Sequence, residues 1–261
     1  MGKLVSLLLT TYNNEAVIGR TLASIEAQDY PFIEICVADS CSTDNTLKII
    51  EEFRNHTKYK VVMESKKDSG IYEGLNNAYK LSSGDYVQVM NDELTVSDAI
   101  SKLVRSIEEL EKTTDPKTVI GAHSDLIYAE DGKVVRYWRM GQGNILSGWM
   151  PAHPTLMLKR EVYEHYGLYD TSYVSASDYE FIVRILIEGG KLAYVPEVLI
   201  SMYYGGTSNA AMYNYVRSIT ESLRGLKENH VKHPLIVTML RTVRVALQFV
   251  NNKNLAQVLP E

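Results

Sequence analysis

Between residues 4 and about 94, short β-branched apolar runs alternate with stretches that repeat at helical spacing. In order, these segments are LVSLLLTTY, EAVIGRTLASIEAQ, IEICVADS, TLKIIEEF, YKVVMES, IYEGLNNAYKL and YVQVMN. Such a succession of strands and helices predicts a doubly wound α/β fold with a mostly parallel sheet. Ligands of these sheets bind beyond the carboxyl ends of the strands, so the polar residues at those ends are candidates for a site.

The second half of the chain departs from this repeat. Two runs that alternate apolar and polar residues, VIGAHSDLIYAE and KVVRYWRM, flank Asp131-Gly132. This dipeptide is typical of a tight hairpin, so the two strands are expected to be antiparallel. Apolar spacing predicts helices over residues 96–110, 159–167 and 177–189, and a strand over 191–198. A mixed, partly antiparallel second half is therefore expected.

Charge and cysteine content narrow the range of partners. With a formal net charge of -5, the chain lacks the basic field that nucleic-acid binding usually needs. Cys36 and Cys41 form no disulfide framework, and no signal peptide or membrane-spanning run is recognisable. We therefore expect a cytoplasmic protein that does not bind nucleic acid.

Acids and amides follow the ends of the predicted strands. They lie in the segments Thr10 to Glu15, Asp39-Ser40, Glu64 to Asp68, and Asn91-Asp92-Glu93. A site along one edge of the sheet explains this concentration. The alternative is that these residues only cap helices and form turns, for which Asn, Asp and Ser are favoured.

Four short motifs follow one another along the chain: TTYNNE with VADSCSTDNT, DSGIYEGLN, VMNDE, and ASDYEF. Together they resemble the bacterial type of the inverting family 2 glycosyltransferases, which have the Rossmann-like GT-A fold. The resemblance covers roughly residues 4 to 209. It implies transfer of a sugar from a nucleoside diphosphate sugar, expected to be a UDP-sugar, to a carbohydrate or lipid-linked acceptor in glycan or polysaccharide synthesis.

By this resemblance, Thr11, Tyr12 and Glu15 line the pocket for the base, and Asp39 accepts a hydrogen bond from the nucleobase. An ionised carboxylate at a strand end suits an imide N–H better than a neutral side chain does. The alternative for Asp39 is a plain turn residue.

In the second element, Lys67, Asp68 and Gly70 are expected to contact the nucleotide. Gly70 allows the backbone to approach a ligand, and the helix that begins there directs its N-terminal amides to an anion. Lys67 would neutralise part of the diphosphate. An ordinary solvated surface lysine is an equally good interpretation.

Asn91, Asp92 and Glu93 take the place of the family's DxD metal site, with Asn91 and Asp92 also expected beside the nucleotide. The sequence departs from the family pattern, because an amide replaces one carboxylate. Oxygen ligands of this kind still suit Mg²⁺ or Mn²⁺, so we expect a divalent cation that binds more weakly than usual.

The last element makes Asp178 the catalytic base, since attack by an acceptor hydroxyl in a single displacement requires one proton acceptor. Glu180 and His153 are expected to contact the acceptor. The alternatives are that Asp178 or Glu180 only complements the dipole of a helix beginning at Ser177, and that His153 is structural.

The sequence thus divides into a GT-A domain over residues 1–209, with a nucleotide-binding half (1–94) and an acceptor half (95–209), and a basic helical extension over 210–261. Residues 217–253 carry seven Lys or Arg and two Glu. This extension is expected to contact the inner membrane face peripherally, to form a homo-oligomer, or to pack on its own domain. An alternative for the whole chain is a degenerate module that binds a nucleotide sugar without transferring it.

Overall fold

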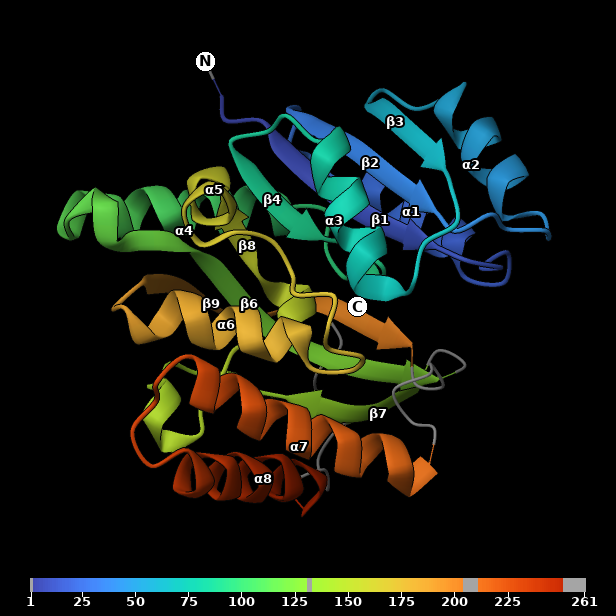
Figure 1. The fold of residues 1–261 in the computed structure, drawn as a ribbon. Helices are drawn as coiled ribbons and strands as arrows, with labels where there is room; N and C mark the ends of the chain where they lie inside the picture. Colours follow the sequence, from blue (N-terminus) through green and yellow to red (C-terminus); the bar gives the residue numbers. More distant parts are fainter. Residues whose placement is uncertain (1, 131–132, 204–210, 251–261) are drawn as a thin grey trace.

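Parallel strands form the first half of the fold in the computed structural model, which describes residues 2–130, 133–203 and 211–250 (Figure 1). Strand β1 (Val5–Thr11) pairs in parallel with β2 (Ile33–Asp39) and with β4 (Tyr86–Val89), and β2 pairs with β3 (Lys60–Ser65). The connecting helices are α1 (Ile18–Glu26), α2 (Thr46–Arg54) and α3 (Ile71–Leu81). The predicted doubly wound α/β pattern is confirmed.

The second half continues the same sheet with four antiparallel pairs and one long parallel pair. Its strands are β5 (Glu93–Leu94), β6 (Val119–Glu130), β7 (Lys133–Trp138), β8 (Met157–Lys159) and β9 (Lys191–Tyr203). The order of the nine-stranded sheet is β3-β2-β1-β4-β8-β6-β9-β5, with β7 paired to β6. The predicted hairpin is present as the antiparallel β6–β7 pair, and its turn residues 131–132 lie outside the described part.

Helices cover both faces of the sheet. One apolar cluster joins the sheet to α1, α2 and α4 (Ala99–Thr113), with Leu22, Ile50 and Leu103 fully or almost fully buried. A second cluster joins the opposite face to α3, α5 (Arg160–Tyr166) and α6 (Ser177–Ile187). Three short 3₁₀ turns, η1 (Pro116–Thr118), η2 (Ile145–Ser147) and η3 (His153–Thr155), lie in the connections.

Helices α7 (Ala211–Glu228) and α8 (Pro234–Val250) pack on the rest of the fold. A third apolar cluster unites Tyr179 and Val183 of α6 with Leu226 of α7 and Val237 of α8. Gly148, at φ +74°, lets the backbone of α8 approach, because a Cβ there would lie 2.4 Å from the amide nitrogen of Arg241. Both helices therefore contact their own domain, and the predicted boundary at residue 209 lies outside the described residues.

Candidate active site

The loops that follow β1 and β2 are joined by hydrogen bonds. The amide of Asn13, a residue at φ +48°, donates to Ser42 Oγ (2.9 Å), and the amide of Thr43 donates to Asn13 Oδ1 (2.8 Å). Glu15 Oε2 accepts from both the amide and the side-chain nitrogen of Asn45, at 2.9 and 2.7 Å. Tyr12, between these contacts in the sequence, is 65% exposed. The two loops form a fixed shelf with one free aromatic face.

Asp39, at the end of β2, connects this shelf to the neighbouring strands. Its carboxylate accepts hydrogen bonds from the hydroxyls of Thr11, Ser42 and Ser65 and from the amide of Ser42. Burial alone would raise the pKa of Asp39, but these four hydrogen bonds outweigh it and lower the pKa below its usual value. Thus Thr11 and Asp39 are brought together as predicted, and both oxygens of Asp39 already have protein donors.

The connection between β3 and α3 lies beside the shelf. Asp68 Oδ1 accepts from Ser40 Oγ (3.0 Å) and from the amide of Gly70 (3.1 Å). Gly70 has φ +144°, a conformation that favours glycine, and no atom lies within 4 Å of where its Cβ would be. The side chain of Lys67 is exposed at the same edge. These three residues lie where the sequence predicts a phosphate site.

Asn91, Asp92 and Glu93 follow β4 and differ in their surroundings. Both ends of the Asn91 amide bind Thr10, accepting from its backbone N and donating to its hydroxyl, each at 2.9 Å. Glu93 pairs with Arg20 at 3.3 Å. Burial and the neighbouring charge of Glu93 raise the pKa of the half-buried Asp92 to about 7. Asn91 therefore supports β1, and Asp92 is the carboxylate left without a cationic partner among the described residues.

The described residues contain no group of three His, Cys, Asp or Glu side chains that could enclose a metal ion. A cation held by one or two carboxylates and completed by diphosphate oxygens needs no such group. Asp92 fits that kind of site, because a divalent cation would favour the ionised carboxylate that burial and, after it, the charge of Glu93 disfavour. Glu93 could contribute only by sharing its carboxylate with Arg20.

Asp178 lies in the first turn of α6 and faces the first turn of α3. The hydroxyl of Tyr72 donates to Asp178 Oδ1 at 2.9 Å, joining residues 106 positions apart. Burial, followed by the charge of Asp178, raises the pKa of Tyr72 well above its usual value, so the phenol remains a donor. In the described part of the chain no other group donates to this half-buried carboxylate, which leaves Oδ2 available.

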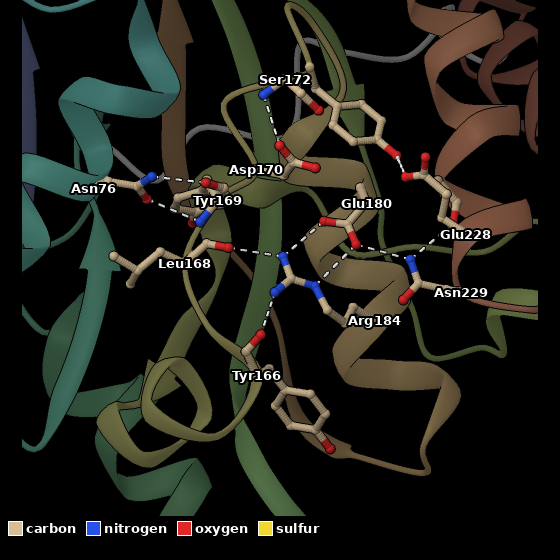
Figure 2. A network of polar contacts seen from close by, with 12 residues as sticks. Asn76, Tyr166, Leu168, Tyr169, Asp170, Ser172, Glu180, Arg184, Glu228 and Asn229 are labelled. Atoms are coloured by element: carbon tan, nitrogen blue, oxygen red, sulfur yellow. Dashed lines mark hydrogen bonds and ion pairs between the residues drawn. The ribbon is translucent and has the colours of Figure 1, made fainter.

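An aromatic group supports this pair. The ring of Tyr72 stacks on Tyr169 with centroids 6.1 Å apart. The side chain of Asn76 binds both backbone polar groups of Tyr169, at 2.8 and 3.0 Å (contacts drawn in Figure 2). His153 Nε2 lies 2.7 Å from the Tyr169 hydroxyl. Burial lowers the pKa of His153, with the charge of Asp178 acting in the opposite direction. A neutral His153 held by Tyr169 is therefore near the base.

Glu180 has a structural role, in contrast to its predicted contact with the acceptor. Its buried carboxylate accepts from Arg184 (3.1 and 2.9 Å) and from Asn229 (3.0 Å) (Figure 2). Arg184 in turn donates to the backbone oxygens of Tyr166 and Leu168. Residues two apart on a helix point in different directions, so Asp178 faces α3 while Glu180 faces α7. Glu180 thus ties α6 to its neighbours rather than to the site.

Glu221 of α7 reaches the loop just before the base. Its carboxylate accepts from the backbone amides of Val174, Ser175 and Ala176, the last two at 2.8 and 3.0 Å through Oε2. Neither Glu221 nor Tyr72 was singled out from the sequence. Glu221 lies outside the resemblance, and Tyr72 was read only as part of the motif DSGIYEGLN.

Comparison with known proteins places these residues in context. The model of the glycosyl transferase family 2 matches residues 6–167. An uncharacterized glycosyltransferase of Haemophilus influenzae is 25% identical over 98% of this chain and 80% of its own length. A dolichyl N-acetyl-alpha-D-glucosaminyl phosphate 3-beta-D-2,3-diacetamido-2,3-dideoxy-beta-D-glucuronosyltransferase of Methanococcus voltae is 26% identical over 76% of this chain and 66% of its own length.

Solved structures share the fold at low identity. TarS 1-349 of S. aureus, in complex with UDP-GlcNAc, aligns with a TM-score of 0.69 at 18% identity, over 95% of this chain and 72% of TarS. The mannosyltransferase PcManGT of Pyrobaculum calidifontis, in complex with GDP-Man and Mn²⁺, aligns with a TM-score of 0.62 at 19% identity, over 96% and 76%. The likeness confirms the GT-A architecture.

Proposed function

The chain belongs to the glycosyl transferase family 2 and is a glycosyltransferase, and on that premise we propose an inverting transfer with Asp178 as the general base. The donor is a nucleoside diphosphate sugar, with a UDP-sugar as first choice. The acceptor is a carbohydrate or lipid-linked glycan in glycan or polysaccharide synthesis. The single observation that carries this proposal is the half-buried Asp178 carboxylate, held by Tyr72 at the edge where the strands end.

The donor class is supported by the neighbours in fold. TarS has been captured with UDP and with UDP-GlcNAc, and PcManGT with GDP-Man, all nucleoside diphosphates or their sugars. In this chain we assign the base to the exposed ring of Tyr12, above the shelf that Thr11, Glu15 and Asp39 hold together. A direct bond from the base to Asp39 would replace one of its four protein donors.

We assign the diphosphate to the turn at Gly70 and the beginning of α3. Lys67 supplies a positive charge at this edge, and Asp68 fixes the turn through the Gly70 amide. Asp92, with Glu93 beside it, would hold the divalent cation, Mg²⁺ or Mn²⁺. When bound, that cation supplies positive charge to the departing diphosphate.

In the proposed reaction, Asp178 Oδ2 takes the proton of an acceptor hydroxyl as the hydroxyl oxygen bonds to the anomeric carbon. The bond from that carbon to the diphosphate oxygen breaks in the same displacement, and its electron pair leaves with the nucleoside diphosphate. Attack opposite the leaving group inverts the anomeric configuration. Tyr72 keeps Asp178 oriented by donating to Oδ1.

The relatives' names favour a lipid-linked acceptor over a free sugar. The Methanococcus voltae enzyme is named for a dolichyl phosphate-linked substrate. A second relative is named a PGL/p-HBAD biosynthesis glycosyltransferase. These names give no support to the alternative of a module that binds a nucleotide sugar without transferring it.

The proposal is tested by screening UDP, GDP and their sugars, each with Mn²⁺, for a rise in melting temperature. The donor identified in this way is then incubated with carbohydrate and lipid-linked acceptors. A ligand that binds only the native state raises the melting temperature. We expect one donor to stabilise the protein and its sugar to appear on an acceptor with inverted configuration by NMR. A product of retained configuration would contradict the proposal.

A further inference from the structure

Helix α8 presents its apolar side to solvent. The residues that face outward are Leu235, Ile236, Met239, Leu240, Val243 and Leu247, which are between 37% and 68% exposed. They recur at helical spacing and cover one side of the helix. We call this set the outward face.

The inward side of the same helix is more polar. The buried or half-buried positions there include Val237 but also Thr238, Arg241 and Thr242. Arg241 lies over the ring of Tyr179 at 4.4 Å, and the hydroxyl of Thr238 donates to the oxygen of Pro234. A surface helix ordinarily buries its apolar side and exposes its polar side. Helix α8 does the reverse, which indicates that its outward face is covered in the working state of the protein.

The charges around the outward face are positive. Lys232 precedes α8, and Arg244 lies exposed on the helix itself, where its Nε donates to the backbone oxygen of Ser147 at 3.1 Å. Residues 229–250 contain no Asp or Glu. The two glutamates of α7 nearest to them are engaged within the chain, Glu221 with the backbone ahead of α6 and Glu228 with Tyr173 and Arg224.

We propose that the outward face of α8 docks on an anionic lipid surface, with its apolar side chains entering the interface and Lys232 and Arg244 contacting the lipid phosphates. No helix in the described part of the chain is long and apolar enough to cross a bilayer, so the contact is one of a helix lying on the surface. A second copy of the chain fits less well. Pairing α8 with α8 would bring arginines together with no acidic residue on the helix to neutralise them.

The experiment is flotation of the full-length protein with vesicles of phosphatidylcholine alone or of phosphatidylcholine with phosphatidylglycerol. The double variant Met239→Gln/Val243→Gln removes two exposed apolar side chains, and Lys232→Gln/Arg244→Gln removes two charges. Each is expected to lower partition into the anionic vesicles by about tenfold or more. Phe32→Gln removes an exposed apolar residue in the loop before β2 and serves as the matched control.

We expect the wild-type protein and Phe32→Gln to float with the anionic vesicles and much less with the neutral ones. Unchanged circular dichroism and melting temperature will show that both double variants are folded. Equal flotation of the wild-type protein and Met239→Gln/Val243→Gln would overturn the proposal, as would equal binding to both kinds of vesicle. A dimer in light scattering that Met239→Gln/Val243→Gln dissolves, without vesicle binding, would assign the face to a second copy instead.

Discussion

The Tyr72 hydroxyl donates a 2.9 Å hydrogen bond to Asp178 Oδ1 and so connects the first turn of α3 with the first turn of α6. The residues around α3 belong to the proposed diphosphate site, and Asp178 is the proposed base. Because the same tyrosine stacks on Tyr169, which Asn76 of α3 also binds, the two sides of the site are held in one arrangement. Tyr72 is therefore a positioning residue for the base.

Replacing Tyr72 by Phe removes this donor and keeps the ring. We expect kcat to fall by about tenfold to a hundredfold, because a hydrogen bond to a charged group contributes roughly 1.5–3 kcal/mol. The donor's KM should change little. Tyr79→Phe, on the same helix but away from Asp178, is the control. A Tyr72→Phe variant with unchanged kcat would show that Tyr72 does not position the base.

Glu221→Gln tests whether α7 positions the base. The carboxylate accepts from three consecutive backbone amides ahead of α6, and a neutral amide accepts more weakly and with one oxygen only. We expect the free energy of unfolding to fall by about 1–3 kcal/mol and kcat to fall with it. Urea denaturation and single-turnover kinetics measure the two effects. The exposed Glu109→Gln on α4 should alter neither, and a fully active Glu221→Gln would argue against this role.

Asp39→Asn should destabilise the fold as well as the nucleotide shelf. An asparagine replaces one acceptor oxygen by a donor, so donors among Thr11, Ser42 and Ser65 lose their partner. We expect a loss of about 2–3 kcal/mol in the free energy of unfolding at pH 7. The lowered pKa of Asp39 means that its contribution is present above the unfolded pKa and is lost as the pH falls through the folded pKa. The difference between wild type and variant should therefore shrink in acid, as measured by urea denaturation.

His123 should make the protein sensitive to mild acid. Its side chain is fully buried and stacks on Tyr194 with centroids 5.0 Å apart, and neither ring nitrogen has a hydrogen-bond partner among the described residues. Burial lowers the pKa of His123 to about 4, whereas the unfolded chain titrates near 6.5. Stability is thus complete above pH 6.5 and falls between 6.5 and about 4, by roughly 3 kcal/mol.

The variant His123→Phe removes this titration and leaves the ring stack. We expect its free energy of unfolding to depend less steeply on pH between about 6.5 and 4 than that of the wild-type protein. Urea denaturation at a series of pH values measures both slopes. Parallel slopes would mean that the pKa of His123 is the same in the folded and the unfolded protein, which would contradict the prediction.

The alternation of strands and helices up to residue 94 was sufficient to predict the parallel half of the sheet, because local periodicity reports which faces are buried. It could not predict that β4 pairs with β8, or that Glu93-Leu94 reaches β9, since those pairings join segments distant in sequence. The strand predicted over 191–198 continues to Tyr203, because β9 pairs along most of β6.

The sequence predicted which candidate residues lie together where motif and strand end coincide, as for Thr11 and Asp39. Asp178 and Glu180 were not separable from sequence, because both are acids in the first turn of one helix and only the packing decides which faces α3. Asn91 was expected to bind a metal, yet its amide is engaged by Thr10. The roles of Tyr72 and Glu221 depend on contacts across tens of residues, which spacing along the chain does not encode.

The most direct test of the central claim compares Asp178→Asn with the wild-type protein in donor binding and in sugar transfer. Asn keeps the size of the side chain but cannot take the acceptor's proton, so donor affinity should stay within about twofold while turnover falls by about a thousandfold or more. Asp170→Asn changes a carboxylate that accepts from the Ser172 amide in the next loop, and this variant should retain turnover. Near-normal transfer by Asp178→Asn would contradict the assignment of Asp178 as the base.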